Sequence, residues 1–203
     1  MNWFARLLGV RNGAVEPDTA DPEEGVKSPW ADFDWKSAEN GIANLLERDL
    51  REFIADNGGE EFYSVAVDCN SLYGDILLSA NTTGALLKKA REYSSSASEF
   101  EIAREIEEMR WGFGDWEYHG INFAKDEGHA GYKRELPDSD VLEHPDDREM
   151  FMECVTRALL RVEASGALDG MRKTVDFKIL CKDDEEEFAE AEERMKRLRG
   201  ADS

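Results

Sequence analysis

Apolar side chains recur every three or four positions over long parts of this chain, a spacing typical of helices packed against a core. The clearest stripe predicts a helix over Asp34–Asp56, and Asn57-Gly58-Gly59 supplies its end. Another helix is predicted from Pro145 to near Gly166. The other helical patterns are Asn2–Leu8, a segment capped by Thr82 or Thr83, Phe100–Met109, and Asp183–Arg199.

Three segments have the composition or the alternation of β-strands. Phe62–Asp68 and Tyr73–Ser79 are joined through Asn70-Ser71, which predicts an antiparallel hairpin. In Thr174–Cys181, the apolar residues Val175, Phe177, Ile179 and Cys181 alternate with the residues between them, which predicts a third strand. The expected class is α+β, with a small, mainly antiparallel sheet of three or four strands packed with about five helices.

The composition changes along the chain and predicts its organisation. Residues 1–30 are expected to form a flexible arm, because Gly9–Pro29 is rich in Gly, Pro, Asp and Glu. Residues 31–199 form one domain and residues 200–203 a tail. The polar run Asn122–Pro145 is predicted to be a long loop.

Large rings gather in one stretch, Glu108–Gly120, which contains Trp111, Phe113, Trp116 and Tyr118 between glycines. Such rings bury large apolar areas in cores and at interfaces. Alternating residues favour a partly buried strand and turn that locks helices to the sheet. A binding face is the alternative.

Acidic side chains greatly outnumber basic ones: 46 Asp and Glu against 25 Lys and Arg give a net charge of −21. Contacts with nucleic-acid phosphates need clustered Lys and Arg, so a nucleic-acid partner is not expected, nor is an anionic membrane. A basic protein fits this charge better. Solubility alone is the competing explanation.

Two further features of the sequence indicate the cellular compartment. Cys69, Cys154 and Cys181 form no CxxC pair and no metal spacing, so buried or free thiols are expected. Met1–Val10 lacks the pattern of a signal peptide, and no apolar run reaches the roughly 18 residues of a membrane span. We therefore expect a cytoplasmic protein.

Candidate chemistry is sparse. The three histidines, His119, His129 and His144, are ten and fifteen residues apart in an expected loop region, which does not predict a metal site. Nucleotide-binding and nucleophile motifs are absent, so no cofactor and no enzyme is expected. The alternative is a small hydrolase that uses Asp115, Glu117 and His119.

Two acidic clusters fit a basic partner, because complementary charge speeds association and sharpens partner choice. The first of them, within Asp138–Glu149, is the favoured contact surface. Acids also favour helix N-termini, which explains only some of them. The first cluster comprises Asp138, Asp140, Glu143, Asp146, Asp147 and Glu149. The second comprises Asp183, Asp184, Glu185, Glu186 and Glu187. Asp115 and Glu117 are added as further candidates.

The aromatic stretch also carries a resemblance. Arg110-Trp111 followed by Asp115-Trp116-Glu117-Tyr118-His119-Gly120 resembles the RW-x-x-x-DW-x-Y-x-G signature of a bacterial domain family of unknown function. The similarity covers about Asp32–Met195 and departs at Gly112-Phe113-Gly114. Members occur in polymorphic-toxin and contact-competition loci, where small acidic proteins act as immunity proteins. The resemblance implies that role and no catalytic residue.

The leading hypothesis is therefore a bacterial immunity protein, or antitoxin, that covers the active site of a cognate toxin. The toxin is expected to be basic, and nuclease, deaminase and ADP-ribosyltransferase chemistries stay open. A non-enzymatic regulatory or scaffold module is the other alternative.

Overall fold

The fold was examined in a computed structural model, which describes residues 30–93, 98–124, 128–136 and 144–201. The predicted helix over Asn2–Leu8 and the predicted linker Gly9–Pro29 lie outside the described residues. The description begins at Trp30, whose ring packs against Phe33 and Trp35 ahead of the first helix.

Helix α1, Trp35–Asn57, confirms the first predicted helix. Asp34 begins it, because its Oδ1 accepts a hydrogen bond from the Ser37 amide at 3.0 Å. The predicted stripe is buried as expected, and Leu46 and Leu50 are fully enclosed. The amphipathic pattern alone was sufficient to place this element.

The sheet has three strands in the order β2-β1-β3. β1 (Glu61–Asn70) and β2 (Asp75–Thr82) form the predicted antiparallel hairpin, with Gly74 at a positive φ in the turn. β3 (Arg172–Asp183) lies parallel to β1 on its other side. The α+β class is confirmed, and the sheet is mixed: a mainly antiparallel arrangement was expected, and it holds only for the β1–β2 pair.

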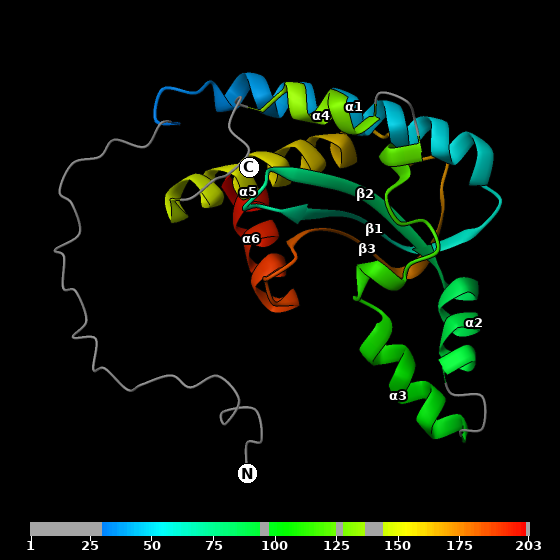
Figure 1. Cartoon of the computed structure of the whole chain (residues 1–203). Coiled ribbons are helices and arrows are strands. Elements are labelled where there is room, and N and C mark those ends of the chain that lie inside the picture. Colours follow the sequence, from blue (N-terminus) through cyan, green and yellow to red (C-terminus); the bar gives the residue numbers. More distant parts are fainter. Residues whose placement is uncertain (1–29, 94–97, 125–127, 137–143, 202–203) are drawn as a thin grey trace, which may run out of the picture.

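The two faces of the sheet differ in chemistry. Paired residues share a face and successive residues alternate between faces. One face carries Val65, Val67, Cys69, Ile76, Leu78, Ile179 and Cys181, all buried. The helices α1 and α5 (Pro145–Ala164) lie on that side (Figure 1). The opposite face carries small or polar side chains such as Ser64, Ala66, Asp68 and Ser79, and we call it the second face.

The aromatic stretch covers one end of the second face, and its rings are mostly inside the fold. Trp116 is 4% exposed, and its Nε1 donates to the Arg110 carbonyl at 3.2 Å. The Tyr63 hydroxyl donates to the same carbonyl at 3.0 Å. Trp111 stacks on Phe188 with ring centroids 4.5 Å apart. The stretch thus joins the sheet to the last helix.

A regular strand was predicted within this stretch, and the structure corrects that prediction. Phe113–Asp115 is a 3-10 turn, and the only strand-like pairing is a single bridge between Ala80 and Tyr118. Just beyond it, the Asn122 side chain accepts from the Leu78 amide at 2.9 Å and donates to the Ile76 carbonyl at 2.8 Å. A short turn and one side-chain amide therefore replace a fourth strand along the edge of β2.

The predicted loop Asn122–Pro145 is wrong in part. It contains most of the 3-10 helix η3 (Ile121–Ala124) and all of the short helix α4 (Gly128–Arg134). Tyr132 of α4 is 1% exposed, and its hydroxyl donates to Asp49 at 3.2 Å. Tertiary contacts hold a segment whose polar composition predicted no structure.

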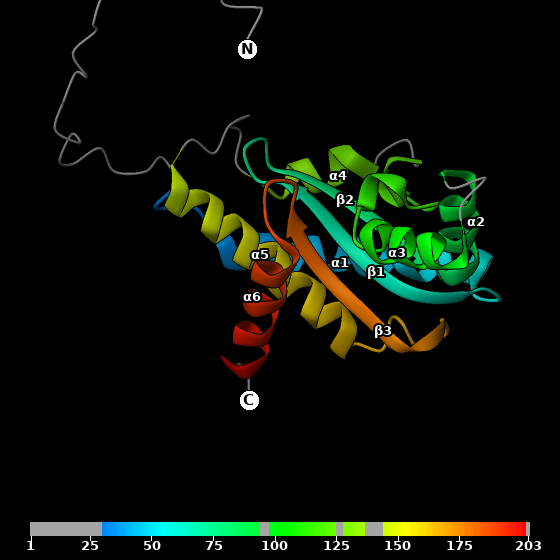
Figure 2. The same cartoon turned by 90° about the horizontal axis from the view of Figure 1, so that it is seen from below.

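Two helices leave the sheet together on the side of the second face (Figures 1 and 2). α2 (Thr83–Tyr93) begins where the Thr82 hydroxyl accepts from the Ala85 amide at 3.1 Å. α3 (Glu99–Met109) begins with a capping box between Ser98 and Glu101. Both predicted helices are confirmed, and we call the pair the α2–α3 arm.

The C-terminal elements confirm one predicted helix and correct another. α5 (Pro145–Ala164) has Pro145 in its first turn, as predicted. α6 spans Phe188–Ala201, so the acids predicted to open this helix precede it. Phe62 and Ser64 of β1 pair with Lys173 and Lys178 of β3. Residues 174–177 of β3 therefore bulge out opposite the single residue Tyr63. Val175, predicted to face inward, is fully exposed on this bulge.

Candidate interaction site

The five acids at residues 183–187 form the turn between β3 and α6, which we call the acidic turn. Its backbone is tied by its own side chains: the Asp183 amide donates to Glu186 Oε2 at 3.1 Å. The Asp183 carboxylate accepts from the Ser71 amide at 2.9 Å, and the Asp184 amide donates to the Cys69 carbonyl at 2.9 Å. The turn is therefore anchored to the β1–β2 hairpin.

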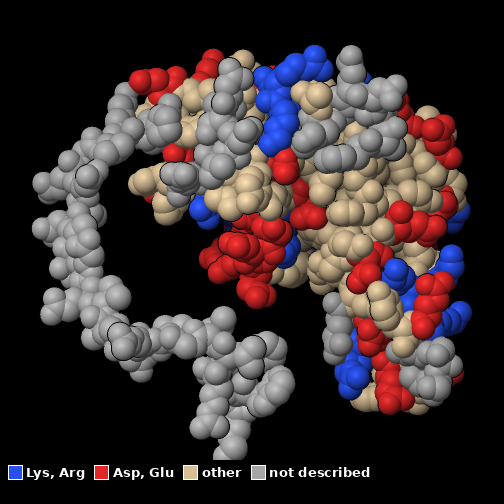
Figure 3. Space-filling model, viewed as in Figure 1, with Lys and Arg blue, Asp and Glu red and all other residues tan. Residues whose placement is uncertain are grey.

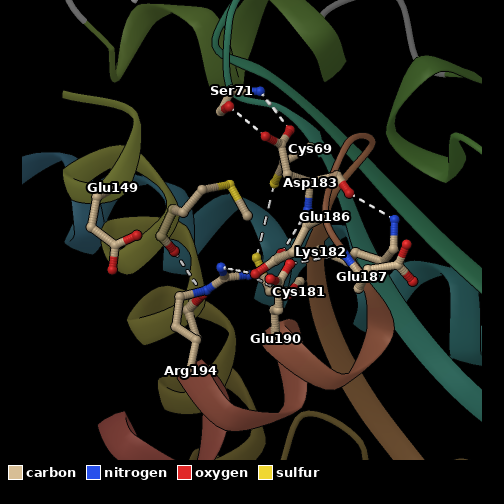
Figure 4. A network of polar contacts seen from close by, with 12 residues as sticks. Cys69, Ser71, Glu149, Cys181, Lys182, Asp183, Glu186, Glu187, Glu190 and Arg194 are labelled. Carbon is tan, nitrogen blue, oxygen red and sulfur yellow. Dashed lines mark hydrogen bonds and ion pairs between the residues drawn. The ribbon is translucent and has the colours of Figure 1, made fainter. Parts of the chain in front are cut away.

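Beneath the acidic turn lies a buried cation, Arg194, only 7% exposed (Figure 4). Its guanidinium donates to Glu186 Oε2 at 2.8 Å, to the Cys181 carbonyl at 2.8 Å and to the Thr156 hydroxyl at 3.1 Å. Burial lowers the pKa of Arg194, but the Glu186 carboxylate outweighs this and leaves the pKa above its ordinary value. Arg194 thus neutralises the inward-facing Glu186.

The remaining acids of the turn face solvent. Asp184, Glu185, Glu187 and the nearby Glu190 are all exposed. Partial burial, followed by repulsion from Asp183, raises the pKa of Asp184. Part of this shift comes from the neighbouring carboxylate, because a like charge disfavours ionisation. Figure 3 shows a continuous red surface in the region where the turn between β3 and α6 lies in Figure 1.

The structure brings the second predicted cluster beside the first. A hollow of about 270 Å³ is lined by acids from both, together with two arginines. Its lining comprises Ser71, Pro145, Arg148, Glu149, Met152, Asp183, Glu185, Glu186 and Arg194. We call it the acidic hollow. The start of α5 and the acidic turn therefore present one surface, although more than thirty residues separate them in the sequence.

The residues of the first cluster differ in their exposure, and some lie outside the described residues. Asp138, Asp140 and Glu143 lie outside the described residues. The Asp146 side chain is 86% exposed, whereas Asp147 is 3% exposed and so is not available on the surface. Glu149 is exposed at 57% and pairs with Arg197 at 2.9 Å.

The other candidate residues lie elsewhere. Asp115 and Glu117 are both exposed and line a second hollow with Lys88 and Lys89, between α2 and the 3-10 turn. The Asp115 carboxylate contacts Lys89 at 3.7 Å and accepts from the Tyr93 hydroxyl at 3.3 Å. These two acids thus lie apart from the acidic hollow and remain accessible to a partner.

His119 does not share those contacts. Its Nε2 lies 3.4 Å from Asp68 Oδ2 on the second face, where burial raises the pKa of Asp68. His144 begins α5, with Nδ1 accepting from the Asp146 amide at 3.2 Å. The proposed hydrolase residues Asp115 and His119 therefore have different partners.

The cysteines are free thiols inside the fold, as predicted. Cys69, Cys154 and Cys181 are all buried, and the Sγ atoms of Cys69 and Cys181 are 3.9 Å apart across neighbouring strands. Burial raises the pKa of Cys154 to about 12, so this thiol stays protonated near neutral pH. Its role is packing against α1, where its Sγ lies 3.6 Å from the Trp35 carbonyl oxygen.

Within the four described ranges, no three or more His, Cys, Asp or Glu side chains are grouped to hold a metal ion. Over the same ranges, no helix is both long and apolar enough to cross a membrane.

Sequence reasoning missed the residues that anchor the acidic turn, Ser71 and Arg194. One signal was available for Arg194, because it falls on the apolar stripe of α6 with Ala191, Met195 and Leu198. A charged residue on a buried stripe requires a buried partner. No local signal indicates Ser71, whose partner Asp183 is distant in the sequence.

Comparison with known families places the chain in one of them. The family model described as "Domain of unknown function (DUF4303)" matches residues 42–200. The chain belongs to this family, and the match includes the whole signature-bearing stretch from Arg110 to Gly120. No curated protein and no solved structure matches the chain.

Proposed function

We propose that the chain is an immunity protein, or antitoxin, that binds a basic toxin protein and covers its active site. The observation that carries the proposal is the convergence of the acidic turn and the start of α5 at the acidic hollow. Exposed acids gather there, and the chain as a whole carries a charge of −21. Nucleases, deaminases and ADP-ribosyltransferases are the classes of basic toxin to test.

The mode of inhibition would be steric. Acids at the edge of an interface accelerate encounter with a basic surface, and the rigid network under the turn holds them in place before binding. Arg194 and Ser71 keep the backbone of the turn fixed, so its ordering costs little on association. The proposal requires no catalytic residue and no cofactor in this chain.

The test is co-expression with the protein encoded by the neighbouring gene in growing bacteria. We expect the wild-type chain to restore growth that the neighbouring product arrests, and a complex to elute as one peak in gel filtration. The complex should weaken as salt rises from 50 to 500 mM, roughly where the Debye length falls from above 10 Å toward 4 Å. Absence of both rescue and complex would refute the proposal.

A further inference from the structure

Helix α3 has an outward face that no described element covers. Ile102 and Ile106 are half-buried and pack toward the core, and Met109 follows on the same side. Phe100, Ala103 and Glu107 follow the helical spacing of the opposite side, and all three are exposed. The arm stands away from the helices α1 and α5 in Figure 1.

Phe100 is the unusual residue on that face. Its side chain is 79% exposed, and among the large apolar residues that the structure describes only Val175 is more exposed. A fully buried aromatic ring contributes a large apolar area to an interface, and such rings often carry most of the binding energy. Phe100 lies one residue into the helix, so its backbone position is fixed by the capping box of Ser98 and Glu101.

The surroundings of Phe100 are acidic. Among the side chains of α3 that the structure describes, one arginine, Arg104, stands against four glutamates: Glu99, Glu101, Glu105 and Glu107. An apolar ring bordered by carboxylates matches a pocket bordered by Lys and Arg, because the ring fills the pocket and the charges pair at its edge. A pocket of an acidic or neutral protein would meet repulsion or lose the pairing.

The arm and the acidic turn lie on the same side of the sheet. Both extend below it in Figure 1, and Figure 2, seen from below, shows them toward opposite ends of the strands. Figure 3 shows acids on both projections. A single basic protein could therefore contact the turn and the outward face of α3 together.

We infer that the outward face of α3 is the anchoring contact for the basic partner, with Phe100 inserted into an apolar pocket rimmed by Lys and Arg. The inference rests on the proposed function and adds the part of the interface that confers most of its affinity. The acidic turn steers the partner, and Phe100 sets how slowly the complex dissociates.

The experiment measures binding of the neighbouring-gene product to purified full-length variants by surface plasmon resonance. Phe100→Ala should raise Kd by about 30-fold or more, the change expected of an interface hot spot, mainly through faster dissociation. Alanine is a better helix former than phenylalanine, so the variant keeps its fold. Val175→Ala is the matched control, a still more exposed apolar residue on the β3 bulge, and should leave Kd within a factor of about two.

A charge-reversal pair isolates the rim. Glu99→Lys with Glu107→Lys should lower the association rate by about 10-fold at low salt, whereas Glu52→Lys with Asp56→Lys on α1 should not. The two results together support the contact. An unchanged Kd for Phe100→Ala, while the wild-type chain binds, overturns the α3 contact and leaves the proposed function standing. Failure of the wild-type chain to bind or protect overturns both.

Discussion

The aromatic stretch and the acidic turn lie on the same side of the sheet and use their side chains in opposite ways. In the stretch, Trp116 and Phe113 are buried against each other, and Trp116 also packs on Tyr63 of β1. Trp111 of the same stretch stacks on Phe188 of α6. In the acidic turn, Glu185 and Glu187 are exposed, whereas the Asp183 and Glu186 carboxylates bond inward. The Asp184 carboxylate accepts from Asn70 Nδ2 at 3.0 Å. Burial distinguishes the two segments. The aromatic stretch is part of the core, whereas the acidic turn has side chains on the surface that a partner could contact.

The difference also shows how an exposed charge cluster is kept rigid. Five successive acids would repel one another in a loose loop. Here a serine and a buried arginine bond two of them, and the others are displayed outward from a fixed backbone. The stretch obtains its rigidity from packed rings, the turn from a satisfied polar network.

Removal of Trp116 gives the largest expected effect. Trp116→Ala should lower the free energy of unfolding by about 3–5 kcal/mol, because a buried ring contact with Tyr63 and Phe113 is replaced by a cavity. Urea denaturation followed by circular dichroism measures it. Val175→Ala, at an exposed position, should change stability by less than about 0.5 kcal/mol. If Trp116→Ala has wild-type stability but no longer binds a partner, the aromatic stretch is the interface and not a part of the core.

Removal of the buried cation comes next. Arg194→Met should cost about 3 kcal/mol, because the Glu186 carboxylate is left with little water and no counter-charge. Adding Glu186→Gln should recover part of that loss, which a double-mutant cycle in urea would quantify. If the double variant is no more stable than Arg194→Met alone, the network does not hold the turn as described.

Reversal of the outward charges tests partner binding while the stability of the fold stays the same. Glu185→Lys with Glu187→Lys should leave the free energy of unfolding within about 0.5 kcal/mol, because neither side chain is buried. The association rate with the basic partner should fall by about 10-fold at low salt. Stopped-flow mixing measures the rate, and Glu52→Lys with Asp56→Lys serves as the control. Equal loss in both pairs would indicate only a general effect of net charge.

The smallest effect concerns Asp184. Its pKa is raised in the folded chain, so the ionised form destabilises the fold, and stability is lost as pH rises through the folded pKa. Asp184→Asn should therefore gain a few tenths of a kcal/mol at pH 7, since the group is largely solvated. The gain should vanish below the ordinary pKa of an aspartate, where both forms are neutral. A gain that persists at pH 3 would contradict the electrostatic cause.

Local pattern was sufficient wherever one element carries its own signal. α1, the β1–β2 hairpin, α2, α3 and the body of α5 follow from periodicity, caps and turn residues. It failed where contacts with distant residues decide the conformation. Tyr132 anchors α4 through its bond to Asp49, and the β3 bulge turns Val175 outward although its alternation indicated the core. The buried rings of the aromatic stretch were recognised, but not its 3-10 turn.

For the candidate site, the sequence determined which residues are acidic and that they fall in two clusters, because composition is local. Only the tertiary structure decided that Glu149 and Glu185 line one hollow, since the parallel placement of β3 brings the end of that strand beside the start of α5. It also decided which charges are available. Arg194 and Ser71 approach from other elements and bond Glu186 and Asp183, while Asp184, Glu185 and Glu187 remain exposed. Each residue determines its own charge, but whether that charge stays exposed depends on the side chains that the fold places next to it.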